Sequence, residues 1–571
     1  MKMIKILALL FVVPLLCLVR PDDFEPRVKT PLGGIKGYYK ISEYGRQYKV
    51  FEGIPYAQPP IGKLRFKAPQ PVVAWPGELQ ATKLAHECLL YNHKPDHLPG
   101  DRVRGSEDCL YLNVYVPDID DYSIPLPVIF WIYGGAFTHG SANMYGARYL
   151  MDKNVILVIA NYRVGPLGFL STDDKVVPGN MGLKDQSMAL RWVHDNIEYF
   201  GGDPNKVTLS GLSAGGASVH YHYLSPLSAG LFQNGISASG TALQCWAQTE
   251  KPLEKAMKLG ILMGCPTEST KEMIKCLRQR PAKAIVEAVK DFMPWLYNPF
   301  TPFGPVVEKA GDKPFINRSP IDILKTGDVA DKPWITSVVS EEGLYPVAEF
   351  AARDDLLKEL NEKWDIIAPY LLDYNYTIPT KLHAKTALKI KNHYMENNPI
   401  NRQNVKSIIK MVGDRMFLVD AEKAARMQAK VNKSPVWFYY YSYRATTSLS
   451  DTFSGTKENF GVSHADDTFL VIENPFVNPT TTESDRTMYQ ELMHLWASFA
   501  EKGIQDFYED WKQVDQSKVE FQYLHISGPE KYKMASDANF GDKKFWASLN
   551  FAENVLESSL DLELNSLKDE L

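Results

Sequence analysis

Apolar residues follow two different spacings along this chain. Pro127–Tyr133 and Val155–Ala160 are continuous apolar stretches, as expected of strands that are buried on both faces of a sheet. Met188–Phe200 carries apolar residues at positions 189, 192, 193, 197 and 200, which indicates a helix with one face against a sheet. Strands and helices that alternate in this way predict an α/β fold with a large central, mostly parallel sheet and right-handed crossovers.

Further strands are expected on either side of this region. Val28–Trp75 contains short alternating stretches broken by Gly and Pro, which indicate antiparallel strands leading into the main sheet. Ile335–Ser340 and Pro435–Arg444 are predicted strands nearer the C-terminus. Residues 246–330 differ in composition, being helix-like and loop-rich. We interpret this segment as a helical insertion within one domain that spans residues 20–567.

The segment Lys206–Gly216 predicts a strand that stops abruptly and turns into a helix. Gly211, Ser213 and Gly215 form the pattern G-x-S-x-G, which is typical of a nucleophile elbow with an exposed serine hydroxyl. Ala214 would open the helix, where its free backbone N–H can face a developing oxyanion. A pentapeptide with three fixed positions also occurs by chance, so this interpretation requires an oxyanion loop upstream and an acid and a histidine downstream.

An upstream loop of the required kind follows the predicted strand Pro127–Tyr133. Adjacent glycines in Gly134–Phe137 allow successive N–H groups to point at one site, and we assign Gly135 and Ala136 to an oxyanion hole. The alternative is an ordinary glycine-rich turn, which the elbow downstream disfavours. His139 follows in the same loop and receives no role, because loop histidines are usually surface or packing residues.

Candidates for the acid and the base follow the elbow in the chain. Glu341 and Glu342 come directly after the predicted strand 335–340, and on spacing alone either could serve. His464 lies in Gly461–Asp467, and the order Ser213, glutamate, histidine is that of α/β-hydrolases. We expect the two aspartates that end this segment to cap or brace the loop rather than to react.

Composition excludes several other classes of protein. The chain has 571 residues, of which 45% are hydrophobic, enough for a large core. Its formal charge of −5 offers no basic surface for nucleic acid. The six cysteines fit an oxidising compartment, and they show neither a C-x-x-C pattern nor a Cys/His zinc spacing. We therefore expect no metal site and no cofactor.

The two ends of the chain resemble targeting signals. Met1–Val19 has lysines at positions 2 and 5 followed by a short apolar run, which predicts a secretory signal peptide. An uncleaved anchor is the alternative, although the run is short for a bilayer and stable membrane insertion is not expected. Lys568–Leu571 reads KDEL, which predicts a KDEL-type retrieval receptor as a partner and residence in the endoplasmic reticulum lumen. Secretion is the alternative to retention.

Five segments together resemble the type-B carboxylesterase/cholinesterase family in order and spacing. They are Phe51–Ala57, Glu107–Asn113, Tyr133–Phe137, Asn161–Arg163 and Gly211–Gly216. The resemblance covers nearly all of the chain after the signal and is strongest to insect carboxylesterases of the hymenopteran venom type. It implies an α/β-hydrolase fold, with helices on both faces of the sheet and the active serine at the base of a gorge.

The resemblance also implies roles for individual residues. The family's E-G dipeptide selects Glu342 over Glu341, and its G-V-x-H motif falls on His464. The implied catalytic triad is therefore Ser213, Glu342 and His464, with an oxyanion hole formed by the N–H groups of Gly135, Ala136 and Ala214.

Disulfides and glycans can be assigned in the same way. The family's two disulfides fall on Cys88–Cys109 and Cys265–Cys276, which leaves Cys245 unpaired. Three asparagines begin N-x-S/T sequons, namely Asn317, Asn375 and Asn432. Proline follows the serine of the first and third sequons, so Asn375 is the best candidate.

The implied activity is that of a serine carboxylic-ester hydrolase acting through an acyl-enzyme on a small-molecule ester. Residues 88–109 lack the tryptophan on which choline binding depends in cholinesterases, and Leu212 replaces a common Glu or Gln. Both features favour neutral, lipophilic esters. A juvenile hormone esterase is an alternative, since Gly461–Asp467 fits G-x-x-H-x-x-D, but Leu212 disfavours it. A non-catalytic, neuroligin-like adhesion protein is disfavoured because all three triad positions are filled.

Overall fold

A sheet of eleven strands organises the structure, a computed structural model that describes residues 25–121, 123–396, 398–504 and 507–554. The strand order is β16-β15-β14-β13-β12-β11-β9-β10-β8-β4-β3. The strands are β3 (Tyr38–Ile41), β4 (Gln47–Pro55), β8 (Tyr111–Pro117), β9 (Leu126–Ile132), β10 (Ile156–Ala160), β11 (Gly202–Leu212), β12 (Asn234–Ala238), β13 (Trp334–Val339), β14 (Val436–Tyr441), β15 (Phe521–Ile526) and β16 (Tyr532–Asp537). The expected signal peptide 1–19 and the KDEL segment 568–571 lie outside the described residues.

The centre of the sheet is parallel and its edges are antiparallel. Pairing is parallel from β10 through β9, β11, β12, β13 and β14 to β15. The edge pairs β15–β16, β10–β8, β8–β4 and β4–β3 are antiparallel. This agrees with the predicted mostly parallel sheet and with antiparallel strands leading into it.

Two small sheets lie outside the main one. β1 (Arg27–Thr30), β2 (Gly33–Lys36) and β5 (Glu78–Gln80) form one, and β6 (Leu90–Tyr91) and β7 (Val103–Arg104) form the other. The second of these lies in the chain between Cys88 and Cys109, which are joined by a disulfide.

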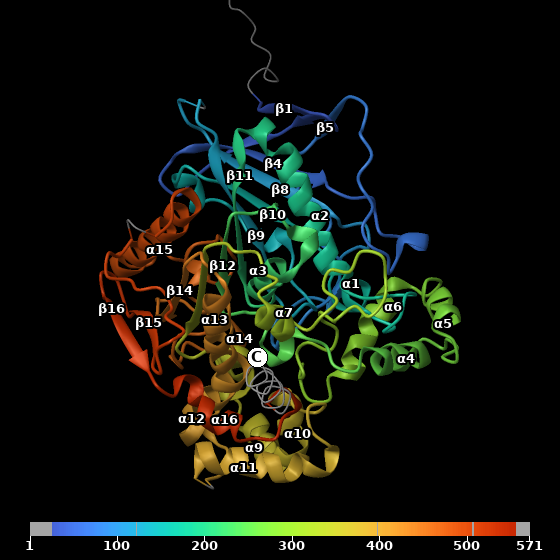
Figure 1. Cartoon of the computed structure of the whole chain (residues 1–571), viewed down its shortest axis with the longest axis vertical. Coiled ribbons are helices and arrows are strands. Elements are labelled where there is room, and N and C mark those ends of the chain that lie inside the picture. Colours follow the sequence, from blue (N-terminus) through green and yellow to red (C-terminus); the bar gives the residue numbers. More distant parts are fainter. Residues whose placement is uncertain (1–24, 122, 397, 505–506, 555–571) are drawn as a thin grey trace, which may run out of the picture.

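Helices cover the sheet and extend beyond it at one end (Figure 1). They are α1 (Gly165–Phe169), α2 (Met181–Asn196), α3 (Ala214–Leu224), α4 (Pro252–Leu262), α5 (Thr270–Leu277), α6 (Ala282–Glu287), α7 (Pro320–Thr326), α8 (Leu344–Ala351), α9 (Asp354–Glu362), α10 (Trp364–Leu371), α11 (His383–Met395), α12 (Val405–Gly413), α13 (Val419–Val431), α14 (Leu449–Ser454), α15 (Glu483–Glu501) and α16 (Lys543–Ala547). Figure 1 shows α9, α10, α11, α12 and α16 gathered at one end of the molecule. A π-helical turn, Asp414–Leu418, joins α12 to α13.

Helices α3 and α15 pack on opposite faces of the central strands β9 and β11. Gly211 faces α3, because a Cβ added there would lie 2.4 Å from the carbonyl carbon of Gly215. Thr208 faces α15. The side-chain amide of Asn234 donates hydrogen bonds both to the Thr208 hydroxyl and to the carbonyl of Phe499, a residue of α15. Residues three apart on a strand point to opposite faces, so the sheet is covered on both sides.

Helix α2 begins at Met181, earlier than the expected start at Met188. Residues 181–187 are all buried, including Lys184, Asp185 and Gln186, so they show no amphipathic stripe. Their polar groups are paired inside the protein: Lys184 with Glu308, and Asp185 with Arg163. A helix buried on all sides does not display the 3.6-residue periodicity on which the prediction relied.

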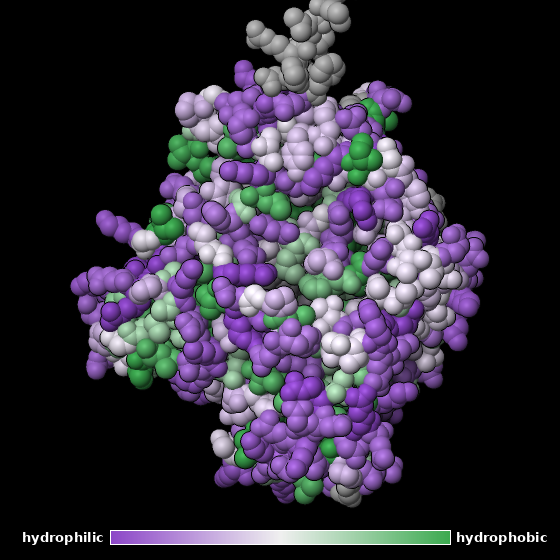
Figure 2. All heavy atoms as spheres, turned by 180° about the vertical axis from the view of Figure 1, so that it is seen from behind, coloured by the Kyte–Doolittle hydropathy of each residue, from purple (hydrophilic) through white to green (hydrophobic). Residues whose placement is uncertain are grey.

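The face of the molecule opposite to the view of Figure 1 is mostly hydrophilic (Figure 2). The face seen in Figure 2 carries its hydrophobic residues in small separate patches. Large aromatic side chains are instead buried, including Trp131, Trp246, Trp334 and Trp496. No helix within the described ranges is long and apolar enough to cross a membrane.

Candidate active site

The turn between β11 and α3 holds Ser213 in an unusual backbone conformation. Its φ is 60° and its ψ is −123°, a combination that is strained for a residue other than glycine. A Cβ on Gly215 would lie 2.0 Å from the carbonyl oxygen of Ile132, so a larger residue would prevent the close approach of strand and helix. Ser213 is only 7% exposed. Its hydroxyl is thus held at the carboxyl end of the central strand.

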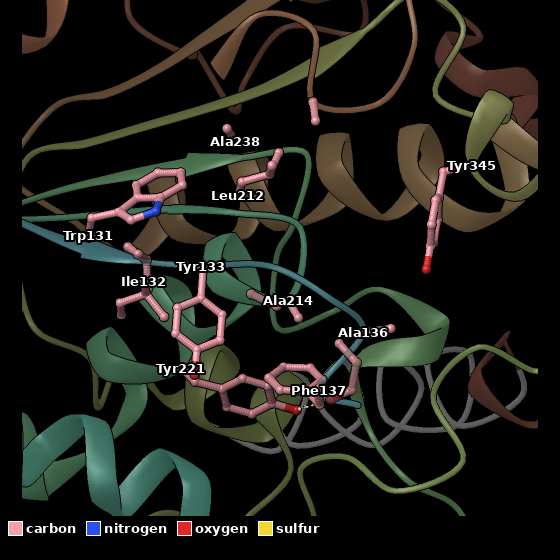
Figure 3. Close-up of a cluster of buried hydrophobic side chains, with 14 of the residues drawn as sticks. Trp131, Ile132, Tyr133, Ala136, Phe137, Leu212, Ala214, Tyr221, Ala238 and Tyr345 are labelled. Carbon is pink, nitrogen blue, oxygen red and sulfur yellow. Dashed lines mark hydrogen bonds between the residues drawn. The ribbon is translucent and has the colours of Figure 1, made fainter. Parts of the chain in front are cut away.

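The loop after β9 lies directly against this serine. A Cβ on Gly134 would be 2.9 Å from the Cβ of Ser213. Gly135 and Ala136 have φ values of 123° and 52° in the loop that follows β9, and Ala214 is the first residue of α3; Figure 3 shows Ala136 and Ala214. Among the described residues, none accepts a hydrogen bond from the N–H of Gly135, Ala136 or Ala214. Three unused N–H donors beside a serine can bind an oxyanion.

A buried carboxylate lies at the end of the next-but-one strand in the sheet. Glu342 follows β13 and is 0% exposed, and its Oε2 accepts a hydrogen bond from His464 Nδ1 at 2.6 Å. Its Oε1 accepts from Ser239 Oγ at 2.5 Å and from the N–H of Val339 at 2.8 Å. With both oxygens engaged, the carboxylate has one fixed orientation toward the imidazole.

Glu341 has a different position and partner. Its carboxylate accepts a hydrogen bond from the N–H of Val462 at 2.7 Å, and its backbone forms a bridge with Ser463. It therefore supports the loop that carries His464 without contacting the imidazole through its side chain. The two glutamates that spacing alone left equivalent are thus distinguished by side-chain direction.

The loop of His464 is held by buried contacts on several sides. The imidazole is 4% exposed, and the ring of Phe417 lies 4.7 Å from it, centroid to centroid. Asp466 accepts hydrogen bonds from the N–H groups of Leu449 and Ser463, at 3.0 Å and 2.8 Å. This aspartate braces the loop, as the sequence suggested.

Ser213 and His464 line the same cavity, which has a volume of about 310 Å³ and is called here the Ser213 cavity. Eight of its other lining residues have large apolar side chains: Leu98, Met144, Leu212, Leu449, Phe453, Phe469, Pro475 and Phe476. Because Nδ1 of the imidazole is bonded to Glu342, Nε2 is the nitrogen left to exchange a proton with a serine hydroxyl. A larger groove of about 850 Å³ lies elsewhere and contains neither Ser213 nor His464.

Four residues of this site were missed by sequence reasoning. His93, His139 and Tyr345 line the Ser213 cavity, and Ser239 anchors Glu342. The sequence predicts no role for His139, whereas in the structure it forms part of the cavity wall. Its position in the loop after the glycines was an available signal, whereas nothing local in the sequence marks His93.

Both expected disulfides are present. Cys88–Cys109 and Cys265–Cys276 have Cα–Cα distances of 4.9 Å and 5.7 Å. Cys245 is a free cysteine, and burial raises the pKa of its thiol well above the usual value. A thiol that stays protonated is a poor nucleophile, which argues against a reactive role for Cys245.

The three sequons differ in their surroundings. Asn317 is exposed, whereas Asn375 is half-buried. The side-chain amide of Asn432 donates to the carbonyl of Lys332 at 3.0 Å. Glycosylation at these positions stays a prediction. Within the part of the chain that the structure describes, no group of three or more His, Cys, Asp or Glu side chains could hold a metal ion.

Comparison with known proteins identifies the family. A model described as the carboxylesterase family matches residues 24–546. Venom carboxylesterase-6 of Apis mellifera is 54% identical over 94% of this chain and 96% of its own length, and a carboxylic ester hydrolase of Bombus ignitus is 53% identical over 94% and 96%. The crystal structure of juvenile hormone esterase from Manduca sexta, with OTFP covalently attached, superposes with a TM-score of 0.79, at 27% identity over 92% of this chain and 99% of that one. This chain therefore belongs to the carboxylesterase family and is a carboxylic ester hydrolase.

Proposed function

We propose that Ser213, Glu342 and His464 are the catalytic triad of a serine esterase that acts on neutral, lipophilic esters through an acyl-enzyme. The observation that carries this proposal is the 2.6 Å hydrogen bond between His464 Nδ1 and the buried Glu342, with Ser213 in the same cavity. This bond fixes the tautomer of the imidazole and stabilises its protonated form during reaction.

The proposed reaction consists of acylation and deacylation of Ser213, and His464 transfers the proton in both steps. His464 Nε2 takes the proton from Ser213 Oγ, which attacks the ester carbonyl carbon. The resulting oxyanion accepts hydrogen bonds from the N–H groups of Gly135, Ala136 and Ala214. His464 then gives the proton to the leaving alcohol, and water repeats the sequence on the acyl group. One oxyanion donor contributes about 3–4 kcal/mol to transition-state stabilisation.

The lining of the Ser213 cavity supports a preference for uncharged substrates. Leu212 is 3% exposed and lines the cavity beside the serine. Lys94 and Arg104 also line it, and none of its described lining residues is Asp or Glu. Arg104 is paired at 2.9 Å with Glu87, which is not among the lining residues, so a cationic alcohol group would meet the Lys94 ammonium and no carboxylate in the cavity wall, at a cost in binding free energy.

Turnover of matched esters tests this proposal. The purified protein is assayed on p-nitrophenyl esters of increasing acyl length, and on butyrylcholine beside its neutral isostere 3,3-dimethylbutyl butyrate. We expect kcat/KM to rise with acyl length over the first members of the series and to favour the neutral isostere. A preference for the choline ester would contradict the proposed substrate class.

A juvenile hormone esterase is the second candidate. It is supported by the similarity to the solved juvenile hormone esterase over 92% of this chain. Hydrolysis of juvenile hormone with a kcat/KM well above that of simple alkyl esters would favour this narrower function. Equal or lower values would favour a general esterase.

A further inference from the structure

One part of the wall of the Ser213 cavity is polar, although most of the lining is apolar. It consists of His93, His139 and Tyr345, which we call the His–Tyr wall. His93 lies in the segment closed by the Cys88–Cys109 disulfide. Tyr345 lies at the start of α8, three residues after Glu342. A few placed polar groups in an apolar cavity fix the orientation of a ligand.

Tyr345 and His93 form a hydrogen-bonded pair. The Tyr345 hydroxyl lies 3.2 Å from His93 Nδ1. Burial lowers the pKa of His93 well below its usual value and lowers that of His139 to about 3. Burial also raises the pKa of Tyr345. The pair is therefore uncharged at neutral pH, and one proton lies between the two side chains.

The pair has hydrogen-bonding capacity left on the tyrosine. A tyrosine hydroxyl can take part in more than one hydrogen bond, as one donor and as an acceptor. His93 Nε2, in contrast, is buried with no partner among the described residues. Nδ1 of His93 is already bonded to the Tyr345 hydroxyl. The Tyr345 hydroxyl is therefore the group of this pair that can form a further hydrogen bond to a ligand.

Packing holds both rings in place. The His93 ring stacks on the Tyr297 ring with a centroid distance of 5.1 Å and an interplanar angle of 11°, and it also contacts the His139 ring at 4.7 Å. The Tyr345 ring contacts Phe300 at 5.5 Å. The backbone of Tyr345 is extended (φ −103°, ψ 109°) within α8, and Figure 3 shows its ring reaching away from the ribbon, with the hydroxyl at the far end.

The Tyr345 ring also lies 5.5 Å from the ring of His464. In the proposed function, His464 gives its proton to the leaving alcohol, so the alcohol portion of the substrate lies beside this imidazole. We propose that His93 carries its proton on Nδ1 and donates it to the Tyr345 oxygen, and that the Tyr345 hydroxyl, positioned in this way, determines specificity by donating a hydrogen bond to a second oxygen atom in the alcohol portion of the ester. The preferred substrates are then uncharged esters of alcohols that carry an ether or carbonyl oxygen. This inference rests on the proposed function.

A pair of isosteric substrates tests the inference. The 2-methoxyethyl and n-butyl esters of one acid have alcohol portions of similar size and differ by an oxygen in place of a methylene. For each enzyme variant the ratio of kcat/KM for the two esters is measured, with active enzyme counted by fluorophosphonate titration. Tyr345→Phe should lower the methoxyethyl/butyl ratio about fivefold, which is the effect of one hydrogen bond.

Two further variants make the result specific. Tyr297→Phe removes a buried hydroxyl from the same stack of rings and should leave the ratio unchanged. His93→Phe removes the partner of Tyr345 and should lower the ratio in the same direction, which provides a second test if Tyr345→Phe folds poorly. An unchanged ratio in both Tyr345→Phe and His93→Phe would overturn the inference. The proposed function fails separately, if Ser213→Ala retains turnover.

Discussion

The carboxylate of Glu342 accepts a hydrogen bond from Nδ1 of His464 at 2.6 Å, although 122 positions separate the two residues in sequence. Glu342 stands at the end of β13, and His464 lies in a loop after β14, the strand next to β13 in the sheet. The parallel pairing of these strands brings their carboxyl ends to one edge. The contact therefore follows from the sheet topology.

The neighbouring carboxylates Glu341 and Glu342 give the first prediction. Glu342→Gln should lower kcat by about three to four orders of magnitude, because the amide no longer holds the imidazole in the required tautomer. Glu341→Gln should reduce kcat only slightly, because an amide oxygen can still accept from the N–H of Val462. The two variants are compared by kcat and thermal unfolding, and the reverse ranking would assign the acid to Glu341.

Ser239 provides a test of how the acid is held. Its hydroxyl donates to Glu342 Oε1 at 2.5 Å, and Ser239→Ala leaves only the Val339 N–H on that oxygen. We expect kcat to fall about tenfold with little change in KM, which corresponds to one hydrogen bond to a charged group. Ser210→Ala is the control, since the Ser210 hydroxyl is buried without a partner among the described residues. Equal kcat in the two variants would show that Ser239 does not position the acid.

Leu212 tests the electrostatic basis of substrate choice. Leu212→Glu places a carboxylate beside His464 and favours the protonated imidazole, so the acidic limb of the kcat/KM profile should move up by about one pH unit. Choline esters should gain relative to neutral esters. Leu212→Gln has similar size without the charge and should leave the limb in place. If both variants give the wild-type profile and selectivity, residue 212 has no influence on the site.

Glu349 predicts a pH dependence of stability. Burial raises the pKa of this carboxyl from 4.5 to about 7. Between these values the folded protein keeps a proton that the unfolded chain releases, so the free energy of unfolding decreases as pH rises toward 7. This loss of stability is absent below pH 4.5 and complete above pH 7, where it amounts to about 3 kcal/mol.

Glu349→Gln should remove this decrease. The free energy of unfolding of the variant, relative to that of the wild type, should therefore increase between pH 4.5 and pH 7. Denaturant unfolding at pH 5 and pH 8, with disulfides intact, measures the difference. Glu362→Gln on the exposed side of α9 is the control and should follow the wild type. A constant difference between Glu349→Gln and wild type across this range would contradict the prediction.

Those parts of the fold and of the site that are marked by local sequence patterns could be predicted from the sequence. The apolar runs located β9 and β10, and G-x-S-x-G located the turn at Ser213, because a strained turn between strand and helix requires small neighbours. The assignment of Glu342 over Glu341 needed a family resemblance, since spacing does not determine side-chain direction.

Other features could not be predicted because they arise from contacts between distant segments. His93 meets Tyr345 across 252 positions, and neither lies in a recognisable pattern. The first half of α2 escaped detection for a related reason. Its polar side chains are paired inside the protein with residues such as Arg163 and Glu308, which no amphipathic pattern reveals.

Covalent labelling tests the assignment of Ser213 most directly. The protein is treated with a fluorophosphonate, and the modified residue is identified by peptide mass spectrometry, with Ser213→Ala and Ser210→Ala treated in parallel. We predict one label per chain on Ser213, loss of ester hydrolysis in step with labelling, and neither label nor turnover in Ser213→Ala, while Ser210→Ala behaves as wild type. Undiminished turnover in Ser213→Ala, or stoichiometric labelling of a different residue, would contradict the assignment of Ser213 as the nucleophile.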